Sequence, residues 1–225
     1  MTGPHATPRD DTPSILAEDG ALLVLAKPAG VAVHPVAEAG VPDLLTWARS
    51  VLGAETGLAP IHRIDRDTSG LVLCSADREL RGRIGRWFAE GEVDKRYRAL
   101  VQGHARRKGI IRRPLRDPRR RAALEAITRY RRLAALGPLS YLEARPLSGR
   151  RHQIRRHLAG IGLAVVGDNR YRPRRFRPVP GFPGRLWLHA HQLELPDGRQ
   201  FTAPLPAALA AHLDLLKELA AGARR

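Results

Sequence analysis

The sequence predicts a single α+β domain. Its 225 residues, 43% of them hydrophobic, are enough to bury one substantial core. Short runs with strand character outnumber the stretches with helical periodicity, a pattern that agrees with the α+β class. No internal stretch is long enough to serve as a linker between domains, and no solenoid-type repeat occurs. One domain, acting as a monomer, is therefore expected.

The chain is expected to begin with a disordered arm. Residues 1–13 are rich in Pro, Thr, Gly and Asp, and such segments lack the apolar surface needed to pack. The predicted domain then covers residues 14–225. Residues 15–26 end in an apolar run that predicts a strand, and the turn formers of residues 27–30 follow it. A short helix is expected at residues 43–52, capped by Asp43.

The middle of the chain continues with strand and helix signals. The apolar residues 71–73 predict a buried strand. Residues 77–90 have apolar side chains at helical spacing, and Gly91 is placed to end that helix; these side chains are Leu80, Ile84, Trp87 and Phe88. Residues 94–103 alternate with a period of two, which indicates a half-buried strand.

The second half contains further strands, a helix rich in arginine and a closing helix. Strands are expected at residues 125–133, 139–147 and 186–195. Residues 150–161 are helical in pattern, with an inward apolar stripe beside two arginines one turn apart. Residues 206–220 predict an amphipathic C-terminal helix.

The charge balance points to a polyanionic partner. Lys and Arg number 39 against 22 Asp and Glu, a formal net charge of +17, and the sequence pI is about 11.4. Nucleic acid is the commonest such partner. Residues 104–123 are a basic, Pro-containing insertion with weak hairpin character that either contacts RNA phosphates or is simply solvated. Residues 172–185 form a second basic, Pro-rich loop. An Arg surplus from GC-rich coding is the alternative explanation, and a membrane surface is a weaker one because no amphipathic anchor segment is evident.

Cysteine usage and the N-terminus predict a cytoplasmic protein. Cys74 is the only cysteine, so no internal disulfide framework can form, and its apolar neighbours indicate a buried small side chain. The first residues contain no signal-peptide core, and no apolar run approaches the ~20 residues that span a bilayer.

The segment Ile61–Cys74, IHRIDRDTSGLVLC, carries the most informative pattern. Asp65 stands between Arg63 and Arg66 in a polar turn that leads directly into a buried strand. A carboxylate presented in this way is either a reactive group or an ordinary turn-capping aspartate. The segment alone leaves both interpretations open.

Other chemistries lack their motifs. The histidines form no HExxH pattern, and His152 and His157 are five residues apart, which separates them around a helix, so no metal site is expected. The glycines form neither a GxGxxG nor a Walker pattern, so no nucleotide cofactor is expected. Ser69 does not sit in a GxSxG elbow, which argues against a serine nucleophile.

Five segments in order resemble the RluA-type pseudouridine synthase family. They are Lys27-Pro28-Ala29-Gly30 with Val33-His34-Pro35, then residues 62–70, Lys95-Arg96-Tyr97, residues 149–158 with Val166-Gly167-Asp168 and Tyr171, and Leu188-His189-Ala190. Departures are small: Ile64 replaces a leucine, Ser148 a threonine, and Arg151 a small polar residue. The resemblance covers nearly everything from Leu22 to Leu195.

The resemblance implies a fold and a reaction. The fold would be the pseudouridine synthase fold, a long, mainly antiparallel mixed β-sheet with flanking helices and a central active-site cleft. The S4-like accessory domain of many relatives has no counterpart in the sequence, so RNA recognition is expected from the catalytic domain itself. The reaction would convert a specific uridine of structured RNA, rRNA or tRNA, to pseudouridine without any cofactor.

The resemblance also assigns residues. Asp65 would be the nucleophile, attacking either the anomeric carbon of the sugar or carbon 6 of the base. Arg155 would pair with Asp65, and Tyr97 would stack on the uracil and relay the carbon 5 proton. The expected RNA contacts are His62, Arg63, Arg66, Arg150, Arg151, Gln153 and His157. Two alternatives stay open: a non-catalytic RNA-binding or ribosome-assembly factor on the same fold, and a nucleoside hydrolase.

Overall fold

The computed structural model describes most of the chain, namely residues 12–36, 40–53, 57–117, 122–173 and 177–223. The predicted N-terminal arm lies almost entirely outside the described residues. Parts of the two basic loops, residues 118–121 and 174–176, also lie outside them.

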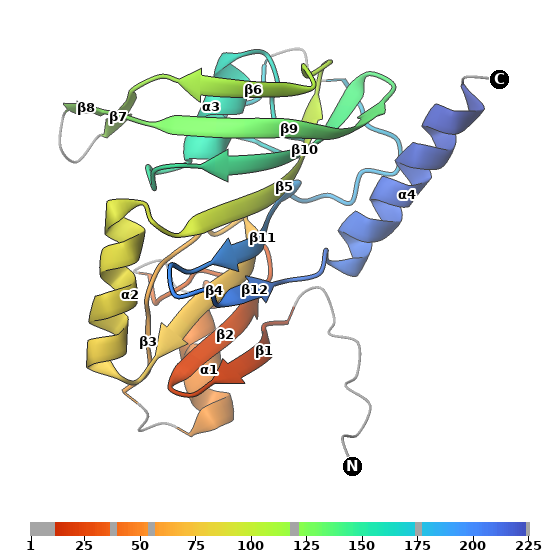
Figure 1. Cartoon of the computed structure of the whole chain (residues 1–225). Helices are drawn as coiled ribbons and strands as arrows, with labels where there is room; N and C mark the ends of the chain where they lie inside the picture. Colours follow the sequence, from red (N-terminus) through yellow and green to blue (C-terminus); the bar gives the residue numbers. More distant parts are fainter. Residues whose placement is uncertain (1–11, 37–39, 54–56, 118–121, 174–176, 224–225) are drawn as a thin grey trace.

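A ten-stranded mixed sheet forms the body of the protein (Figure 1). Its main order is β1-β2-β4-β11-β5-β10-β9-β6, with β3 paired to β4 and β12 paired to β11. The strands are β1 Ser14–Asp19, β2 Leu22–Lys27, β3 Ala59–Pro60, β4 Ser69–Ser75, β5 Asp94–Gln102, β6 Lys108–Arg112, β9 Ile127–Leu136, β10 Leu139–Pro146, β11 Leu188–Glu194 and β12 Gln200–Thr202. Among the strand pairs of the described residues, only β4–β11 is parallel. The sheet is therefore mainly antiparallel, as the sequence resemblance predicted.

Four helices flank this sheet within the described part of the chain: α1 Leu44–Leu52, α2 Arg78–Glu90, α3 Gln153–Gly160 and α4 Ala207–Gly222. A small separate hairpin joins β7 Leu115–Asp117 to β8 Ala122–Leu124. Asp43 is the N-cap of α1, as predicted, and accepts a hydrogen bond from Thr46 N. Asp77 is the N-cap of α2. Gly91 ends α2 at a φ of 81°, a backbone conformation that glycine adopts without strain.

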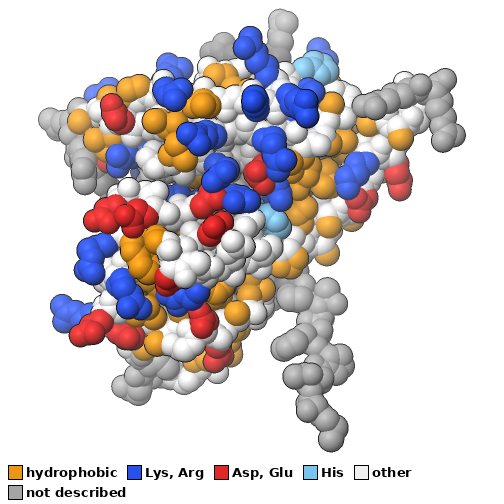
Figure 2. Space-filling view, in the orientation of Figure 1, with side chains coloured by type: hydrophobic (Ala, Val, Ile, Leu, Met, Phe, Trp, Pro, Cys, Tyr) orange, Lys and Arg blue, Asp and Glu red, His pale blue; other side chains and the backbone are white. Residues whose placement is uncertain are grey.

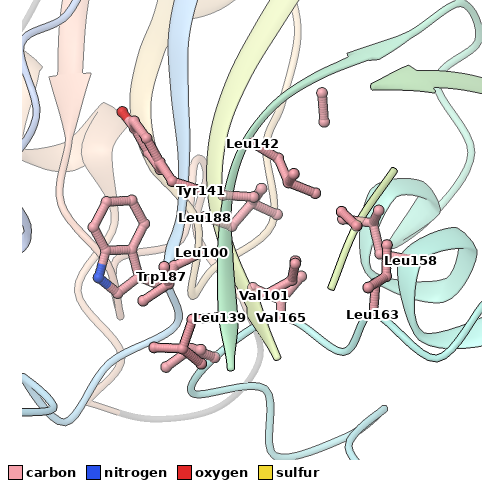
Figure 3. Packing of buried hydrophobic residues seen from close by; sticks show 14 of the residues in the cluster. Leu100, Val101, Leu139, Tyr141, Leu142, Leu158, Leu163, Val165, Trp187 and Leu188 are labelled. Atoms are coloured by element: carbon pink, nitrogen blue, oxygen red, sulfur yellow. The ribbon is translucent and has the colours of Figure 1, made fainter. Parts of the chain in front are cut away.

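The largest hydrophobic cluster lies where β5, β10 and β11 meet helices α3 and α4. Trp187 is fully buried within it, and its ring meets that of Tyr141 edge-on with centroids 5.6 Å apart. Figure 3 shows the aliphatic side chains around these two rings. Trp187 Nε1 donates to His212 Nδ1 of α4 at 3.0 Å, which ties the last helix to the core.

A close approach of two strands positions the start of β4. At the parallel junction His189 aligns with Ser69 and Ala190 with Gly70. Gly70 has a φ of +118°, and a Cβ atom there would collide with the backbone of Ala190. Only glycine fits. The turn that precedes β4 is thereby held against β11 at the middle of the sheet.

Several details differ from the sequence prediction, among them the strands β3, β6 and β7, which were not predicted. The predicted strand at residues 15–26 is a hairpin, in which β1 and β2 are joined at Gly20. The strand β12 was not predicted. Helix α3 begins at Gln153 and not at residue 150, because His152 has a φ of 52° and cannot be part of the helix.

No helix in the described ranges is long and apolar enough to cross a membrane.

Candidate active site

A cleft of about 640 Å³ opens where the turn before β4, the strand β5 and the first turn of α3 converge. Its walls come from segments that are far apart in sequence. Nine of the ten predicted site residues line it: Asp65, Tyr97, Arg155, His62, Arg63, Arg66, Arg150, Arg151 and Gln153. The tenth, His157, does not. The structure therefore gathers the predicted residues around one concave space of the size that holds a small ligand.

The turn that carries Asp65 is fixed at both ends. Ile64 is buried in the core beside β2 and α1, and Thr68 N donates to Asp65 O at 3.1 Å. The carboxylate itself is 27% exposed and faces the cleft. A rigid backbone thus presents a solvent-accessible carboxylate.

Lys27 holds the same turn from inside the protein. Its side chain is 1% exposed, and Nζ donates to the carbonyl oxygens of Pro28, Val31 and Arg66 at 2.7, 2.7 and 2.8 Å. Burial lowers the pKa of Lys27 to about 7, against the opposing effect of Asp67. The Lys-Pro-Ala-Gly turn is in this way connected to the turn of the candidate nucleophile.

Arg155 lies beside Asp65 but is bound more closely to Asp168. Arg155 Nη1 is 3.8 Å from Asp65 Oδ2, whereas its Nε and Nη2 donate to the Asp168 carboxylate at 2.7 and 2.9 Å. Burial alone would raise the pKa of Asp168, but hydrogen bonds from Arg155 and from the Tyr171 and Arg170 amides lower it overall. The predicted Arg155–Asp65 pair is therefore a loose one, and Asp168 is the partner that orients the guanidinium.

His152 is a cleft residue to which the sequence analysis gave no role. Its Nε2 is 3.8 Å from Asp65 Oδ1, and its Nδ1 is 2.9 Å from the Tyr171 hydroxyl. Burial lowers the pKa of His152, and the charge of Asp65 opposes this effect. Its φ of 52°, unusual outside glycine, turns the chain into α3 and aims the ring at the carboxylate.

Tyr97 enters the cleft from β5, and Lys95, two residues earlier on the same strand, also lines it. Burial, and secondarily the charge of Asp65, raises the pKa of Tyr97 far above its ordinary value. The phenol therefore stays protonated at physiological pH. Lys95 Nζ lies 5.8 Å from the centre of the Phe88 ring, close enough for a cation–π contact.

His62 supports the wall of the cleft as well as lining it. Its Nε2 accepts a hydrogen bond from Leu73 N at 3.0 Å, and its ring stacks on Phe88 with centroids 4.3 Å apart. Burial, together with the charge of Lys95, lowers the pKa of His62 to about 3, so the ring is neutral. The sequence analysis expected an RNA contact here and did not foresee this bond to β4.

Four of the predicted RNA contacts are exposed at the rim: Arg63, Arg66, Arg150 and Arg151. Their placement surrounds the mouth of the cleft with positive charge.

The remaining two expected RNA contacts, Gln153 and His157, have buried side chains that form hydrogen bonds within the protein. Gln153 accepts from Ser148 Oγ at 2.7 Å and donates to the Ile127 carbonyl at 2.9 Å. The ring nitrogens of His157 lie 2.8 Å from Thr128 Oγ1 and 2.9 Å from the carbonyl oxygen of residue 113. These hydrogen bonds attach α3 to β9.

The chemistry that this arrangement can perform centres on one carboxylate. Arg155 and His152 stand at ion-pair distance from Asp65 but beyond hydrogen-bond distance. The carboxylate oxygens consequently remain available to attack an electrophilic carbon. Among the described residues, no group of three or more His, Cys, Asp or Glu side chains is placed to hold a metal ion.

Comparison with known families places this cleft in context. The profile of the family described as RNA pseudouridylate synthase matches residues 21–160, a range that includes Asp65, Tyr97 and Arg155. The described structure is also similar to a solved human structure named RNA Pseudouridylate Synthase Domain Containing 4. The two share 25% identity and a TM-score of 0.77, over 90% of this chain and 92% of that one. A second human structure, Domain Containing 1, is 24% identical with a TM-score of 0.71 and supports the fold alone.

Curated proteins give the same result. The chain is 35% identical to ribosomal large subunit pseudouridine synthase D of Zymomonas mobilis, over 74% of this chain and 58% of that protein. It is 38% identical to an uncharacterised RNA pseudouridine synthase of Chloroflexus aurantiacus, over 86% and 66% of the two lengths. It is 31% identical to tRNA pseudouridine synthase C of Haemophilus ducreyi, over 80% and 83%. The chain thus spans less than two thirds of the length of the first two relatives.

Proposed function

The chain belongs to the RNA pseudouridylate synthase family, and we propose that it isomerises a specific uridine of rRNA or tRNA to pseudouridine with Asp65 as the nucleophile. One observation carries the proposal most directly. Asp65, Tyr97 and Arg155 come from a turn, a strand and a helix that are distant in sequence, and they line one cleft. A polar cleft of this composition suits an uncharged base whose conversion passes through a charged or covalent intermediate.

The reaction breaks one bond and forms another. The bond between N1 of uracil and the anomeric carbon breaks, the uracil turns while bound, and carbon 5 bonds to the anomeric carbon. Carbon 5 loses its proton, and N1 gains one. Asp65 attacks either the anomeric carbon, which displaces the uracil, or carbon 6, which activates the base for detachment. In both routes the carboxylate leaves again at the end.

Neighbouring groups position the reactants. His152 lies 3.8 Å from one oxygen of Asp65 and Arg155 lies 3.8 Å from the other, and the two charges favour one orientation of the carboxylate. Tyr97 lines the cleft and offers a ring face that suits stacking on the uracil. In the proposed relay, its hydroxyl accepts the carbon 5 proton as it passes its own proton on. The alternative interpretation is that Arg155 and His152 belong to a structural ion network and that Tyr97 is a core aromatic residue.

RNA enters with the target nucleotide out of its stack, because the carboxylate lies inside a cleft that a duplex cannot enter. The rim arginines Arg63, Arg66, Arg150 and Arg151 are exposed and suited to bind phosphates around the extruded nucleotide. In this proposal the protein acts as a monomer in the cytoplasm and uses no nucleotide cofactor.

Two other functions remain as competitors. A non-catalytic RNA-binding or ribosome-assembly factor could keep the fold, but it would have no need of Asp65, Tyr97 and Arg155 together. A nucleoside hydrolase would cleave the same glycosidic bond and release the base. The close pairing of Arg155 with Asp168 favours a catalytic role over a binding factor, because a catalytic carboxylate needs its orienting cation fixed. Release of free uracil is the result that would favour the hydrolase over the isomerase.

Mapping of pseudouridines in total RNA, from cells with and without this gene, tests the proposal. One or a few sites should lose the modification when the gene is absent, and purified protein should restore them. Loss of no site, or release of free uracil in place of pseudouridine, would contradict the proposal. Binding of the same RNA should also weaken steeply with salt, because phosphate contacts release counterions.

A further inference from the structure

A second set of basic side chains lies on the face of the sheet opposite the cleft. Along β5, Tyr97 points to the cleft, so its neighbours Arg96 and Arg98 point to the other side. The strand register extends this face across the sheet, because Arg98 aligns with Glu143, Glu143 with Arg131, and Arg131 with Lys108. Seven basic residues share it, here called the outer basic face: Arg96, Arg98, Lys108, Arg112, Arg129, Arg131 and Arg145.

No helix in the described part of the chain covers this set of side chains. Helix α3 packs behind the same strands, because Thr128 of β9 contacts Gln153 there. Helix α4 covers only the far end of the outer side, around Tyr141 and Trp187. Figure 2 shows lysine and arginine side chains gathered over the strands β6, β9, β10 and β5 in the view of Figure 1. The face is open to solvent.

Acidic neighbours neutralise this face only in part. Glu143 accepts from Arg98 at 2.8 Å and from Arg131 at 3.3 Å. Asp94 is 2.9 Å from Arg96 and 2.7 Å from Arg145, and Glu194 is 3.5 Å from Arg96. Seven basic side chains thus face three acidic ones, an excess of four positive charges.

Three members of the face, Lys108, Arg112 and Arg129, are exposed and form no ion pair with any residue that the structure describes. Four adjacent strands span about 14 Å at the usual spacing of β-sheets. Uncompensated positive charge at this density raises the energy of the free protein, and a bound row of phosphates would lower it. A phosphate backbone is the partner that complements such a surface.

We propose that the outer basic face binds a second phosphate-bearing segment of the RNA substrate, separate from the segment that enters the cleft. The proposal rests on the proposed function, in that the RNA in the cleft is the one being modified. The two faces lie on opposite sides of one sheet, so a short stem-loop seated in the cleft does not reach both. The favoured substrate class is therefore a large folded RNA that extends around the protein, such as a ribosomal RNA, over an isolated stem-loop.

Charge reversal of two unpaired members tests this proposal. The double variant Lys108→Glu/Arg129→Glu changes two exposed side chains and breaks no ion pair seen in the described residues. The control Arg78→Glu/Lys217→Glu makes the same change of net charge at exposed positions on α2 and α4. Both proteins are compared with the wild type on in vitro transcribed large-subunit ribosomal RNA and on a short uridine-containing hairpin.

The outer-face variant should bind the long RNA at least tenfold more weakly than the control variant does. The slope of log affinity against log salt should become less steep by roughly 1 to 2, the value for two lost phosphate contacts. Its affinity and its turnover on the short hairpin should equal those of the control. Equal long-RNA affinity for the two variants would overturn the proposal. It would also be overturned if the outer-face variant lost only binding to vesicles of anionic lipid.

Failure of this inference is distinguishable from failure of the proposed function. If wild-type protein forms no pseudouridine in any RNA, the proposed function fails, whatever the affinity data show. If pseudouridine forms and the outer-face variant matches the control on long RNA, only the second RNA contact is refuted.

Discussion

Arginines in the cleft and on the outer basic face are held in opposite ways. Arg155 in the cleft is 5% exposed and donates two hydrogen bonds to the buried Asp168. Arg131 on the outer basic face is 64% exposed and touches Glu143 at 3.3 Å. Burial makes the first contact rigid and costly to break, whereas solvent screens the second and leaves the side chain adaptable. The cleft is therefore suited to hold one reacting group in a fixed position, whereas the outer basic face is suited to bind a flexible polymer.

The largest loss of stability is expected from Asp168→Ala. Removal of this carboxylate leaves the Arg155 guanidinium buried without its close partner, a change that typically costs about 3 to 5 kcal/mol. Chemical denaturation of the wild type and the variant measures the difference. Asp168→Asn, which preserves size and one acceptor, should lose less. An unchanged free energy of unfolding for Asp168→Ala would show that the pair does not hold the first turn of α3.

Lys27→Met tests the link between the Lys-Pro-Ala-Gly turn and the turn of Asp65. Methionine has a similar length but no donor, so the carbonyl oxygens of Pro28 and Val31 lose a hydrogen bond and the free energy of unfolding should fall by about 1 to 3 kcal/mol. The turn loses its link through the Arg66 carbonyl, and turnover should fall about 10-fold to 100-fold, because small displacements of a reacting group are costly. Lys108→Met on the outer basic face serves as the control, with normal turnover on a short hairpin. Equal turnover of both variants would refute the anchoring role.

Acidification should destabilise the protein through its buried histidines. Burial lowers the pKa of His62 and of His189 from 6.5 to about 3. Between these two pH values the unfolded chain binds protons that the folded protein does not, so stability falls as the pH is lowered from about 6.5 towards 3. The combined loss should be on the order of 2 kcal/mol or more.

Denaturation curves at a series of pH values measure this loss. A His62→Gln variant, which lacks one of the two rings, should show a shallower decline than the wild type. A wild-type curve that is flat over the same window would contradict the assignment of neutral, buried rings.

The smallest effect on stability is expected on the outer basic face. Lys108→Ala and Arg129→Ala remove exposed side chains that form no ion pair with described residues, so each should change the free energy of unfolding by less than about 0.5 kcal/mol. A loss of several kcal/mol would mean that these side chains support the fold, and the contrast between the two surfaces would disappear.

Local signals in the sequence were sufficient for much of the fold. Helix α1 begins at the predicted cap Asp43, and helix α2 lies within the predicted range 77–90; in both, a capping side chain and apolar periodicity coincide. The hairpin at Gly20 was not predicted, because the outer half of β1 is exposed and ends in Glu18 and Asp19, which weakens its strand pattern. Short exposed strands have little periodicity to recognise.

The sequence predicted which residues line the cleft better than it predicted the partners that these residues contact. Motif resemblance indicated nine residues that do line the cleft, but spacing along the chain does not show which partner an arginine contacts. Arg155 binds Asp168 more closely than Asp65 because the loop after α3 returns beneath it. Gln153 faces inward because His152 takes a positive φ and starts the helix late. Such outcomes depend on tertiary packing, which no local pattern contains.

Pseudouridine formation by Asp65→Asn tests the central claim most directly. Asparagine keeps the shape of the side chain but removes its negative charge and most of its nucleophilicity. The variant should form no pseudouridine in the mapped RNA, while its free energy of unfolding and its RNA affinity stay close to those of the wild type. Full activity of Asp65→Asn would contradict the account.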